Sequence, residues 1–472
     1  MSRDVAWRWA LGIWALSTLF STFLRPITPI DETRYLTVAW EMYLAGDPWL
    51  PTLNGVPYSD KPPLLFWLIN LGWWLFGTND IWPRVMTAAF GLGVAVLVAR
   101  TSSALRPEDP HIGGRAALAM TATSVWLLFN GAVMFDVMLT FFVLSAIVII
   151  LGMRGIGATR QWLMVGVSLG LGVLTKGPVA LLHALPLALL APIWRPSLEG
   201  SRPYSWWPWY RGLLLSLFVT VAILSIWLIP AIARGGQAFL DQLVWQQTID
   251  RVATTTHHLR PGWFYLAILP VVLFPWWLMP QFWRRPRLLR VLLSWIIPVL
   301  VAFSCFRGKQ LHYLFPLIPA LAIVIADASA ESEPRRLGIL EKGAAISVSI
   351  LLVAYVAIGL RFGEAYDVTP MAKRIHRLQQ SGAAVAQFGR YHGQFQFAGR
   401  LTEPLSVIVT PEDWQSFKAQ HPHGYVVIYS RDQSLSINDA VFTQRFRSQS
   451  MSLWRVDTVD TSGLSQRFRM RN

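Results

Sequence analysis

Residues 135–154 read FDVMLTFFVLSAIVIILGMR, an uninterrupted apolar run that has Asp136 at one end and Arg154 at the other. A helix of about 20 apolar residues crosses the hydrocarbon core of a bilayer. Basic residues are typical of the cytoplasmic end of such a helix, whereas a carboxylate at membrane depth is costly unless it has a partner. The stretch therefore predicts a membrane-spanning helix with Asp136 at its outer end.

The whole chain has the composition of a membrane protein. Of its 472 residues, 54% are hydrophobic and only 14% are charged, whereas a soluble protein of this size needs more polar surface. The net charge of +15 comes largely from arginines between apolar runs, where they fix membrane orientation, so no nucleic-acid partner is predicted. The single cysteine, Cys305, excludes an intramolecular disulfide and a Cys-rich metal site.

The apolar runs predict an all-α polytopic membrane domain with about 11 transmembrane helices. They are residues 6–24, 80–99, 116–133, 137–153, 161–174, 178–194, 212–232, 263–283, 291–305, 311–327 and 343–360. The first run could be a signal peptide, but no small-residue cleavage pattern follows it, so we expect an uncleaved span. Residues 62–77 are short and begin with two prolines, and we expect an interfacial helix there, with a span as the alternative.

The charges between the runs predict the orientation. With the N-terminus in the cytoplasm, the arginine clusters all fall on the cytoplasmic side, as in the bacterial inner membrane. The remaining gaps, above all the outer loops 25–79 and 233–262, then face the periplasm and carry charges of both signs. We expect a transmembrane domain over residues 1–360. Residues 361–472 alternate apolar and polar residues between polar turns, which predicts a small soluble α/β or α+β domain on the periplasmic side.

The first outer loop contains two groups of charged residues. Asp31, Glu32 and Arg34 precede a helical pattern from Tyr35 to Ala45, and Asp31 could simply cap that helix. Lys61 follows Asp60 and precedes two prolines, which would hold both charges at the interface. A snorkelling lysine is the alternative explanation for Lys61.

Further charged residues gather in the other outer gaps. Asp136 could be a hydrated loop residue, and Lys176 could belong to a simple Gly-Pro turn. The loop 233–262 carries Arg251 and the adjacent pair His257–His258, but adjacent side chains point apart, which disfavours a metal site. Lys309 and Tyr313 introduce the run 311–327 and could be interfacial anchors. Together, cations at the lipid boundary suit a phosphate whose tail stays in the membrane, and carboxylates suit hydroxyl groups or general-base work.

Several motifs carry a resemblance to a known family. They are DETRY at residues 31–35, YSDKPPLLFW at 58–67, FDVMLTFF at 135–142, TKGPVALL at 175–182 and GKQLHYLFPLIPAL at 308–321. In this order they resemble the membrane glycosyltransferases of the lipid A aminoarabinose transferase type, relatives of the protein O-mannosyltransferases. The resemblance implies the C-type glycosyltransferase fold and a sugar donor on a polyprenyl (undecaprenyl) phosphate. It also implies inverting transfer of a hexosyl or pentosyl group to a periplasmic acceptor such as lipid A, another glycolipid, a glycan or a protein.

The same resemblance implies roles for individual residues. Asp31 and Asp136 match catalytic acidic positions, and the donor-phosphate group would be Arg34, Lys61, Arg251 and Tyr313. We expect substrate contacts from Glu32, Asp60, Lys176, His258 and Lys309. Gln246 and Gln247 occupy the neighbourhood where the aminoarabinose transferases have a histidine. No metal ligand is therefore assigned and no cofactor is certain, although a divalent metal stays open.

The central expectation is geometric: Asp31, Lys61, Asp136, Arg251 and Tyr313 should converge on one lipid-fed cavity. Two other functions stay open, a flippase for lipid-linked sugars and an O-antigen ligase or polymerase. A flippase would need buried charges at mid-membrane and inverted internal symmetry, and the sequence shows neither. The O-antigen enzymes lack the Lys-Pro-Pro arrangement of the first loop.

Overall fold

The chain folds into two compact units. The computed structural model describes residues 3–153, 155, 157–199, 205–243, 259–283, 289–329, 338–430 and 440–459. One unit comprises Met1–Thr22 and Ser59–Ala354, and the other comprises Phe23–Tyr58 and Tyr355–Asn472. The boundary predicted after residue 360 falls inside one long helix, α17 (Ile339–Tyr366).

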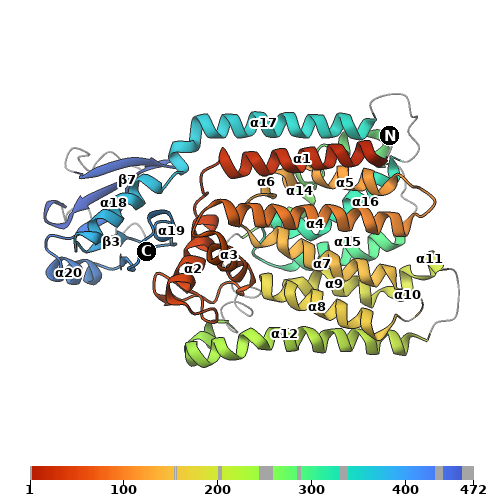
Figure 1. Ribbon diagram of the computed structural model, residues 1–472, viewed down its shortest axis with the longest axis horizontal. Coiled ribbons are helices and arrows are strands. Elements are labelled where there is room, and N and C mark those ends of the chain that lie inside the picture. Colours follow the sequence, from red (N-terminus) through yellow and green to blue (C-terminus); the bar gives the residue numbers. More distant parts are fainter. Residues whose placement is uncertain are drawn as a thin grey trace. The chain divides into compact units, whose positions relative to one another are not determined.

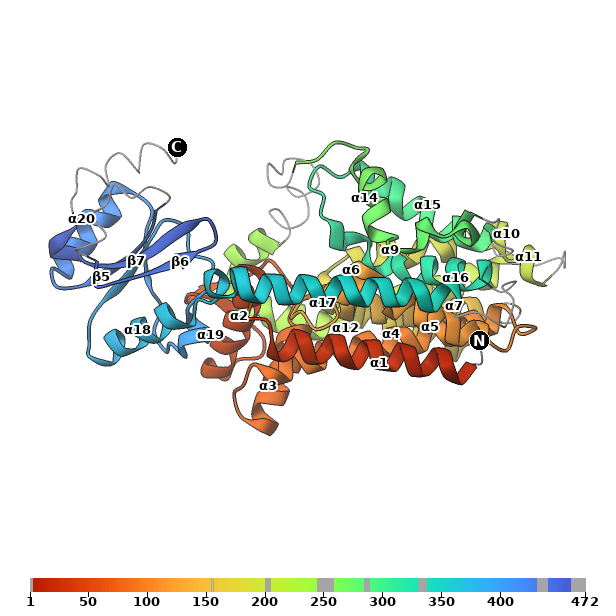
Figure 2. The same ribbon diagram turned by 90° about the horizontal axis from the view of Figure 1, so that it is seen from above.

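The first unit is helical. Figures 1 and 2 show α1, α4, α7, α8 and α12 running alongside one another. The α-helices that lie wholly or mostly in this unit are α1 (Arg3–Phe23), α3 (Leu64–Phe76), α4 (Ile81–Leu105), α5 (Ile112–Thr121), α6 (Ser124–Phe129), α7 (Phe135–Gly152), α8 (Thr159–Lys176), α9 (Val179–Leu189), α10 (Ala191–Trp194), α11 (Pro196–Glu199), α12 (Trp206–Asp241), α14 (Phe264–Val272), α15 (Leu289–Cys305), α16 (Ile318–Ala328) and α17. Short 3₁₀ helices are η2 (Trp276–Leu278), η3 (Pro280–Trp283) and η4 (Leu311–Leu317).

The protein is a multi-pass membrane protein. Among the described residues, five helices are long and apolar enough to cross a membrane, and a sixth span results if one bent pair is counted as one. The five are Ile81–Leu105, Phe135–Gly152, Trp206–Asp241, Leu311–Ala328 and Leu340–Ala357, and the bent pair is Val179–Leu189 with Ala191–Leu198. The count of eleven stays a prediction. Helix α3 has 13 residues, about 20 Å at 1.5 Å per residue, which is short for a span.

Some predicted runs are interrupted in the structure. The run 116–133 contains two helices, α5 and α6, which are separated at Ala122 and Thr123. The run 263–283 is α-helical only in α14 and continues as 3₁₀ turns, because Pro275 and Pro280 lack the amide hydrogen that a continuing helix needs. A single continuous helix was therefore the wrong expectation for both runs.

Glycines let α8 and α12 pack closely. Gly166 and Gly170 lie four residues apart on α8, the spacing that brings membrane helices together. A Cβ atom on Gly166 would lie 2.6 Å from the carbonyl oxygen of Ser216, and one on Gly170 would lie 2.9 Å from Cβ of Ile223. The hydroxyl of Thr220 donates to the Gly166 carbonyl at 3.2 Å, which links the two helices at their crossing.

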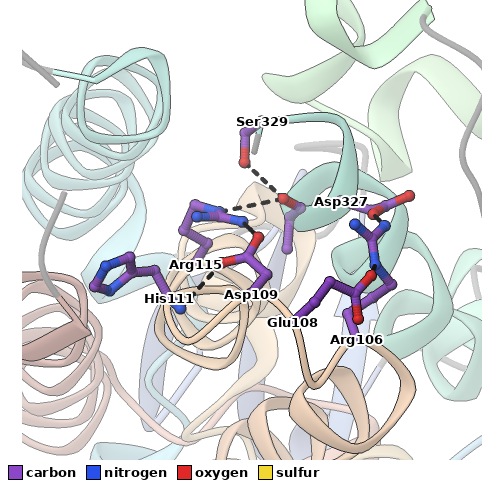
Figure 3. A network of polar contacts seen from close by, with 8 residues as sticks. Arg106, Glu108, Asp109, His111, Arg115, Asp327 and Ser329 are labelled. Atoms are coloured by element: carbon purple, nitrogen blue, oxygen red, sulfur yellow. Dashed lines mark hydrogen bonds and ion pairs between the residues drawn. The ribbon is translucent and has the colours of Figure 1, made fainter. Parts of the chain in front are cut away.

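A buried ionic network ties the ends of α4, α5 and α16 together (Figure 3). Arg106, just past α4, pairs with Glu108 and with Asp327 of α16. Arg115 of α5 pairs with Asp109 and donates to the Ala326 carbonyl at 3.2 Å. Burial alone raises the pKa of Asp109, but the hydrogen bond and charge of Arg115 hold that pKa below its ordinary value. Arg106 and Arg115 were among the arginines predicted to lie on the cytoplasmic side. Their ion pairs and hydrogen bonds join helix ends, which gives both residues a structural role.

The second unit contains a five-stranded mixed sheet in the order β4-β3-β5-β7-β6. Strands β4, β3 and β5 are parallel, whereas β7 is antiparallel to both β5 and β6. The elements of this unit are α2 (Asp31–Ala45), β1 (Thr52–Leu53), β2 (Val56–Pro57), α18 (Thr369–Gln380), β3 (Val385–Phe388), α19 (Gln396–Gly399), β4 (Ser406–Ile408), α20 (Pro411–Gln420), β5 (Tyr425–Ser430), β6 (Phe442–Phe446), β7 (Gln449–Arg455) and η6 (Val456–Thr458).

Both faces of this sheet are covered by helices. Successive strand residues point to opposite faces, so Val427 packs with Met371 and Ile375 of α18, whereas Val426 packs with Trp414 and Phe417 of α20. The expected α/β or α+β domain is therefore present as an α/β arrangement.

The part of the first outer loop up to Tyr58 belongs to the second unit. Trp40 of α2 donates to the Leu401 carbonyl at 2.8 Å, and Thr37 donates to the Gly393 carbonyl at 2.5 Å. Asn54, in the turn between β1 and β2, donates to the Leu405 carbonyl at 2.9 Å. These bonds join segments more than 350 positions apart in the chain, which no local sequence pattern predicts.

Candidate functional site

A buried ion pair lies at one end of the first unit's helices. Lys176 is the last residue of α8 and Asp136 lies in the first turn of α7, and their Nζ and Oδ1 atoms are 2.5 Å apart. Helix dipoles favour an anion at the first turn and a cation at the last turn, so both charges suit their positions. Asp136 is only 2% exposed, so a hydrated loop residue was the wrong alternative.

Aromatic residues of the segment that follows α15 complete one side of this pair. The Lys176 ammonium lies 5.1 Å from the centre of the Tyr313 ring, within cation–π distance. The neighbouring His312 is close enough for its charge to act on Asp136. Both residues are in η4, where Pro316 follows them and the chain turns into α16.

Lys61 of the first outer loop lies within electrostatic range of the same carboxylate. Its charge also acts on Asp136, and its Nζ donates to the carbonyl of Asp60 at 3.0 Å. Pro62 and Pro63 follow, and α3 begins at Leu64, as the sequence predicted. We define Lys61, Asp136, Lys176, His312 and Tyr313 as the ammonium cluster. It contains two lysines and one histidine but only one carboxylate. This excess of basic side chains favours the binding of an anion.

Lys309 is bonded to the protein itself. Its ammonium donates to the Arg260 carbonyl at 3.2 Å and to the Phe306 carbonyl, and the residue is buried. Leu259 and Gly308 form a β-bridge beside it. This geometry gives Lys309 a role in joining two loops, and its substrate contact stays a prediction.

His183, near the ammonium cluster, was not predicted from the sequence. This histidine of α9 is fully buried, and its ring centre lies 5.1 Å from that of Phe303. Lys176 and Asp136 both act on it electrostatically. A signal was available, because His183 interrupts the otherwise apolar run 178–194.

Asp31 and Glu32 of the first loop lie in the second unit. Asp31 begins α2 and pairs with Arg34 at 2.5 Å, but its side chain makes no cap bond, so the capping explanation was wrong. Both oxygens of Glu32 accept from Arg25, at 2.5 and 2.8 Å, and the Thr28 amide donates to one of them. Glu32 thus has a structural partner, and its substrate contact stays a prediction. The convergence of Asp31 with the ammonium cluster also stays a prediction.

Two predicted site residues, Arg251 and His258, lie outside the described residues. Within the described ranges, no group of three His, Cys, Asp or Glu side chains is arranged to hold a metal ion.

Comparisons with known proteins show which proteins this chain is similar to. Residues 60–227, which include Lys61, Asp136 and Lys176 of the ammonium cluster, match the model of the dolichyl-phosphate-mannose-protein mannosyltransferase family. Two curated relatives are undecaprenyl phosphate-alpha-4-amino-4-deoxy-L-arabinose arabinosyl transferases. The one from Pseudomonas fluorescens is 32% identical over 340 residues, which is 68% of this chain and 56% of the relative. The one from Sodalis glossinidius is 29% identical over 344 residues, which is 70% of this chain and 60% of the relative.

The fold has a solved counterpart. The crystal structure of ArnT from Cupriavidus metallidurans bound to undecaprenyl phosphate superposes with a TM-score of 0.69 at 19% identity. The superposition covers 94% of this chain and 97% of that one.

The chain is similar in sequence to these transferases. The resemblance seen in the sequence motifs is thereby confirmed, and so is the expected fold of a helical membrane domain with a small C-terminal domain. The matched part spans less than two thirds of the length of either arabinosyl transferase.

Proposed function

We propose that this protein is an integral membrane glycosyltransferase that uses a polyprenyl-phosphate sugar donor. The observation that carries the proposal is the ammonium cluster, in which Lys176 pairs with a buried carboxylate at the end of a helical membrane unit and Lys61 lies within electrostatic range of it. The transferases that resemble this chain are named for an undecaprenyl phosphate donor, which supports the same donor here.

The cluster has the electrostatics that a departing phosphate requires. Cleavage of the glycosidic bond leaves negative charge on the polyprenyl phosphate, and fixed cations stabilise that charge as it develops. Lys176 is held by Asp136 and by the Tyr313 ring, so its ammonium is positioned before substrate binds. Lys61 extends its ammonium on a flexible four-carbon stem from the loop before α3, so it can adjust to the phosphate.

In the proposed reaction, an acceptor oxygen attacks the anomeric carbon of a hexosyl or pentosyl group on the face opposite the phosphate. The new carbon–oxygen bond forms as the bond to the phosphate oxygen breaks, and configuration inverts. The polyprenyl phosphate leaves with the electron pair and needs no proton, because its phosphate is stable as an anion. An acceptor hydroxyl transfers its proton to a carboxylate, for which Asp31 is the proposed base. An ionised phosphate acceptor has no proton to lose, and Asp31 then only positions it.

We place this chemistry at the periplasmic face of the bacterial inner membrane, with lipid A, another glycolipid, a glycan or a protein as acceptor. The distribution of arginines along the sequence supports the orientation.

The test reconstitutes the purified full-length protein in proteoliposomes with radiolabelled undecaprenyl-phosphate sugars and a periplasmic lipid and glycan extract. We expect label to move into the extract with release of undecaprenyl phosphate. Label that crosses the bilayer while still attached to its carrier would instead identify a flippase and overturn the proposal. Mass spectrometry of glycolipids and glycoproteins from a deletion strain and its parent would then name the acceptor.

A further inference from the structure

The second unit gathers positive charge at one edge of its sheet. Arg390 and His392 lie in the loop after β3, and Arg447 lies in the turn after β6. Strands β3 and β5 are parallel, and β6 has the same direction as β5 because β7 is antiparallel to both. The loop and the turn therefore leave the sheet at the same edge. In open α/β sheets, ligands bind outside the carboxyl ends of the strands, which is this edge.

The start of α2 reaches this edge as well. The Arg447 guanidinium donates to the carbonyl of Pro29, two residues before Asp31. The groups whose charges act on His392 are Arg34, Arg390, Arg447 and Asp31. Three guanidinium groups and one carboxylate thus lie within electrostatic range of one imidazole. Like charges repel at this range, and an arrangement of this kind is stabilised when an anion binds between them.

The backbone of Arg447 belongs to the two-residue turn that joins β6 to β7. Its φ of 54° is usual for the first position of such a hairpin turn. The surroundings hold the residue in place: its amide donates to the Ala365 carbonyl at 2.8 Å, and its guanidinium lies 5.8 Å from the Tyr366 ring centre.

We propose that Arg34, Arg390, His392 and Arg447 form a binding site for an anionic group, a phosphate or carboxylate, carried by the acceptor. That the anionic group belongs to the acceptor rests on the proposed function. Anion binding itself does not depend on transfer activity. Guanidinium groups present paired N–H donors that match the oxygens of such groups. The second unit would thereby select acceptors by charge, whereas the ammonium cluster of the first unit receives the donor phosphate.

A binding experiment on the full-length protein in phosphatidylcholine nanodiscs tests the site directly. Inorganic pyrophosphate is titrated by calorimetry into the wild type, Arg390→Gln and Arg445→Gln. Arg390 is exposed and Arg445 is an exposed arginine of β6, so the two variants lose the same charge from the same unit. We expect Arg390→Gln to weaken binding about tenfold or more, since a hydrogen bond to a charged group is lost, and Arg445→Gln to leave it unchanged. Absent wild-type binding, or equal effects of the two variants, would overturn the site.

Two further arms separate the possible sources and the two proposals. Nanodiscs that contain phosphatidic acid test whether the anionic group is a lipid headgroup. If it is, this lipid should compete with pyrophosphate for the wild-type protein and should not compete for Arg390→Gln. In the transfer assay, Arg390→Gln should raise the KM for the acceptor about tenfold and leave the KM for the donor unchanged. An unchanged acceptor KM with an active wild type would overturn this inference alone. Arg390-dependent anion binding by a wild type that transfers no sugar would overturn the proposed function alone.

Discussion

The ammonium nitrogen of Lys176 lies 2.5 Å from a carboxylate oxygen of Asp136 and 5.1 Å from the centre of the Tyr313 ring. The two charged residues end one helix and begin another, 40 positions apart in the chain. Both are largely buried, so each charge depends on the other for its stabilisation.

Replacement of Lys176 by methionine should leave the Asp136 carboxylate buried without its ion-pair partner. We expect the free energy of unfolding to fall by about 3–5 kcal/mol, as is usual when one partner of a buried pair is removed. The double variant Asp136→Asn with Lys176→Met should recover most of that stability but not transfer activity. Thermal unfolding in detergent and the transfer assay measure the two effects. A double variant with wild-type activity would show that the pair is structural only.

Lys61→Gln should raise the KM for the polyprenyl-phosphate donor. Loss of one charge-assisted hydrogen bond to phosphate corresponds to about a tenfold to hundredfold change in affinity. The KM for the acceptor should stay the same. Lys373→Gln removes an exposed lysine of α18 and serves as the matched control. If both variants keep the wild-type donor KM, Lys61 does not bind the donor.

Asp31→Asn separates the two possible roles of this carboxylate. With a hydroxyl acceptor, loss of a general base should lower kcat by about 10²–10⁴-fold. With an ionised acceptor, kcat should change little. Full activity on every acceptor tested would remove Asp31 from the mechanism.

Gly166→Ala should destabilise the protein through the contact between α8 and α12. The added methyl group would lie 2.6 Å from the Ser216 carbonyl oxygen, and backbone cannot move aside as a flexible side chain can. Overpacking of this kind costs about 1–3 kcal/mol. Gly152→Ala, at the end of α7, is the control, because nothing lies within 4 Å of the position that its added methyl group would take. Equal melting temperatures for both variants would contradict the close crossing.

The stability of the protein should depend on pH through His392. Burial lowers the pKa of this imidazole, and Arg34, Arg390 and Arg447 lower it further, against the opposing effect of Asp31. Since the folded state disfavours the charged form, the unfolded state binds more protons between the folded pKa and the ordinary value of about 6.5. Stability should therefore rise with pH through that window. In His392→Gln the melting temperature should change less between about pH 5 and pH 7, and an unchanged slope would contradict the shift.

Local patterns in the sequence determined much of this protein. Apolar runs and the arginines between them predicted the membrane helices, because the cost of exposing polar groups to lipid applies to each segment by itself. Alternating residues after position 360 predicted the strands, because successive side chains of a strand point to opposite faces. The motifs around Lys61, Asp136, Lys176 and Tyr313 predicted catalytic and substrate-binding residues, and the structure brings these residues together.

Only the tertiary structure decided which polar groups already have partners. Glu32 is bound by Arg25 and Lys309 by two backbone carbonyls, although in sequence both resemble residues available to a substrate. Likewise, Arg447 meets the Pro29 carbonyl across 418 positions of chain. Polar groups of this kind are satisfied by partners that the packing of distant segments brings close. No single stretch of sequence therefore identifies the partner.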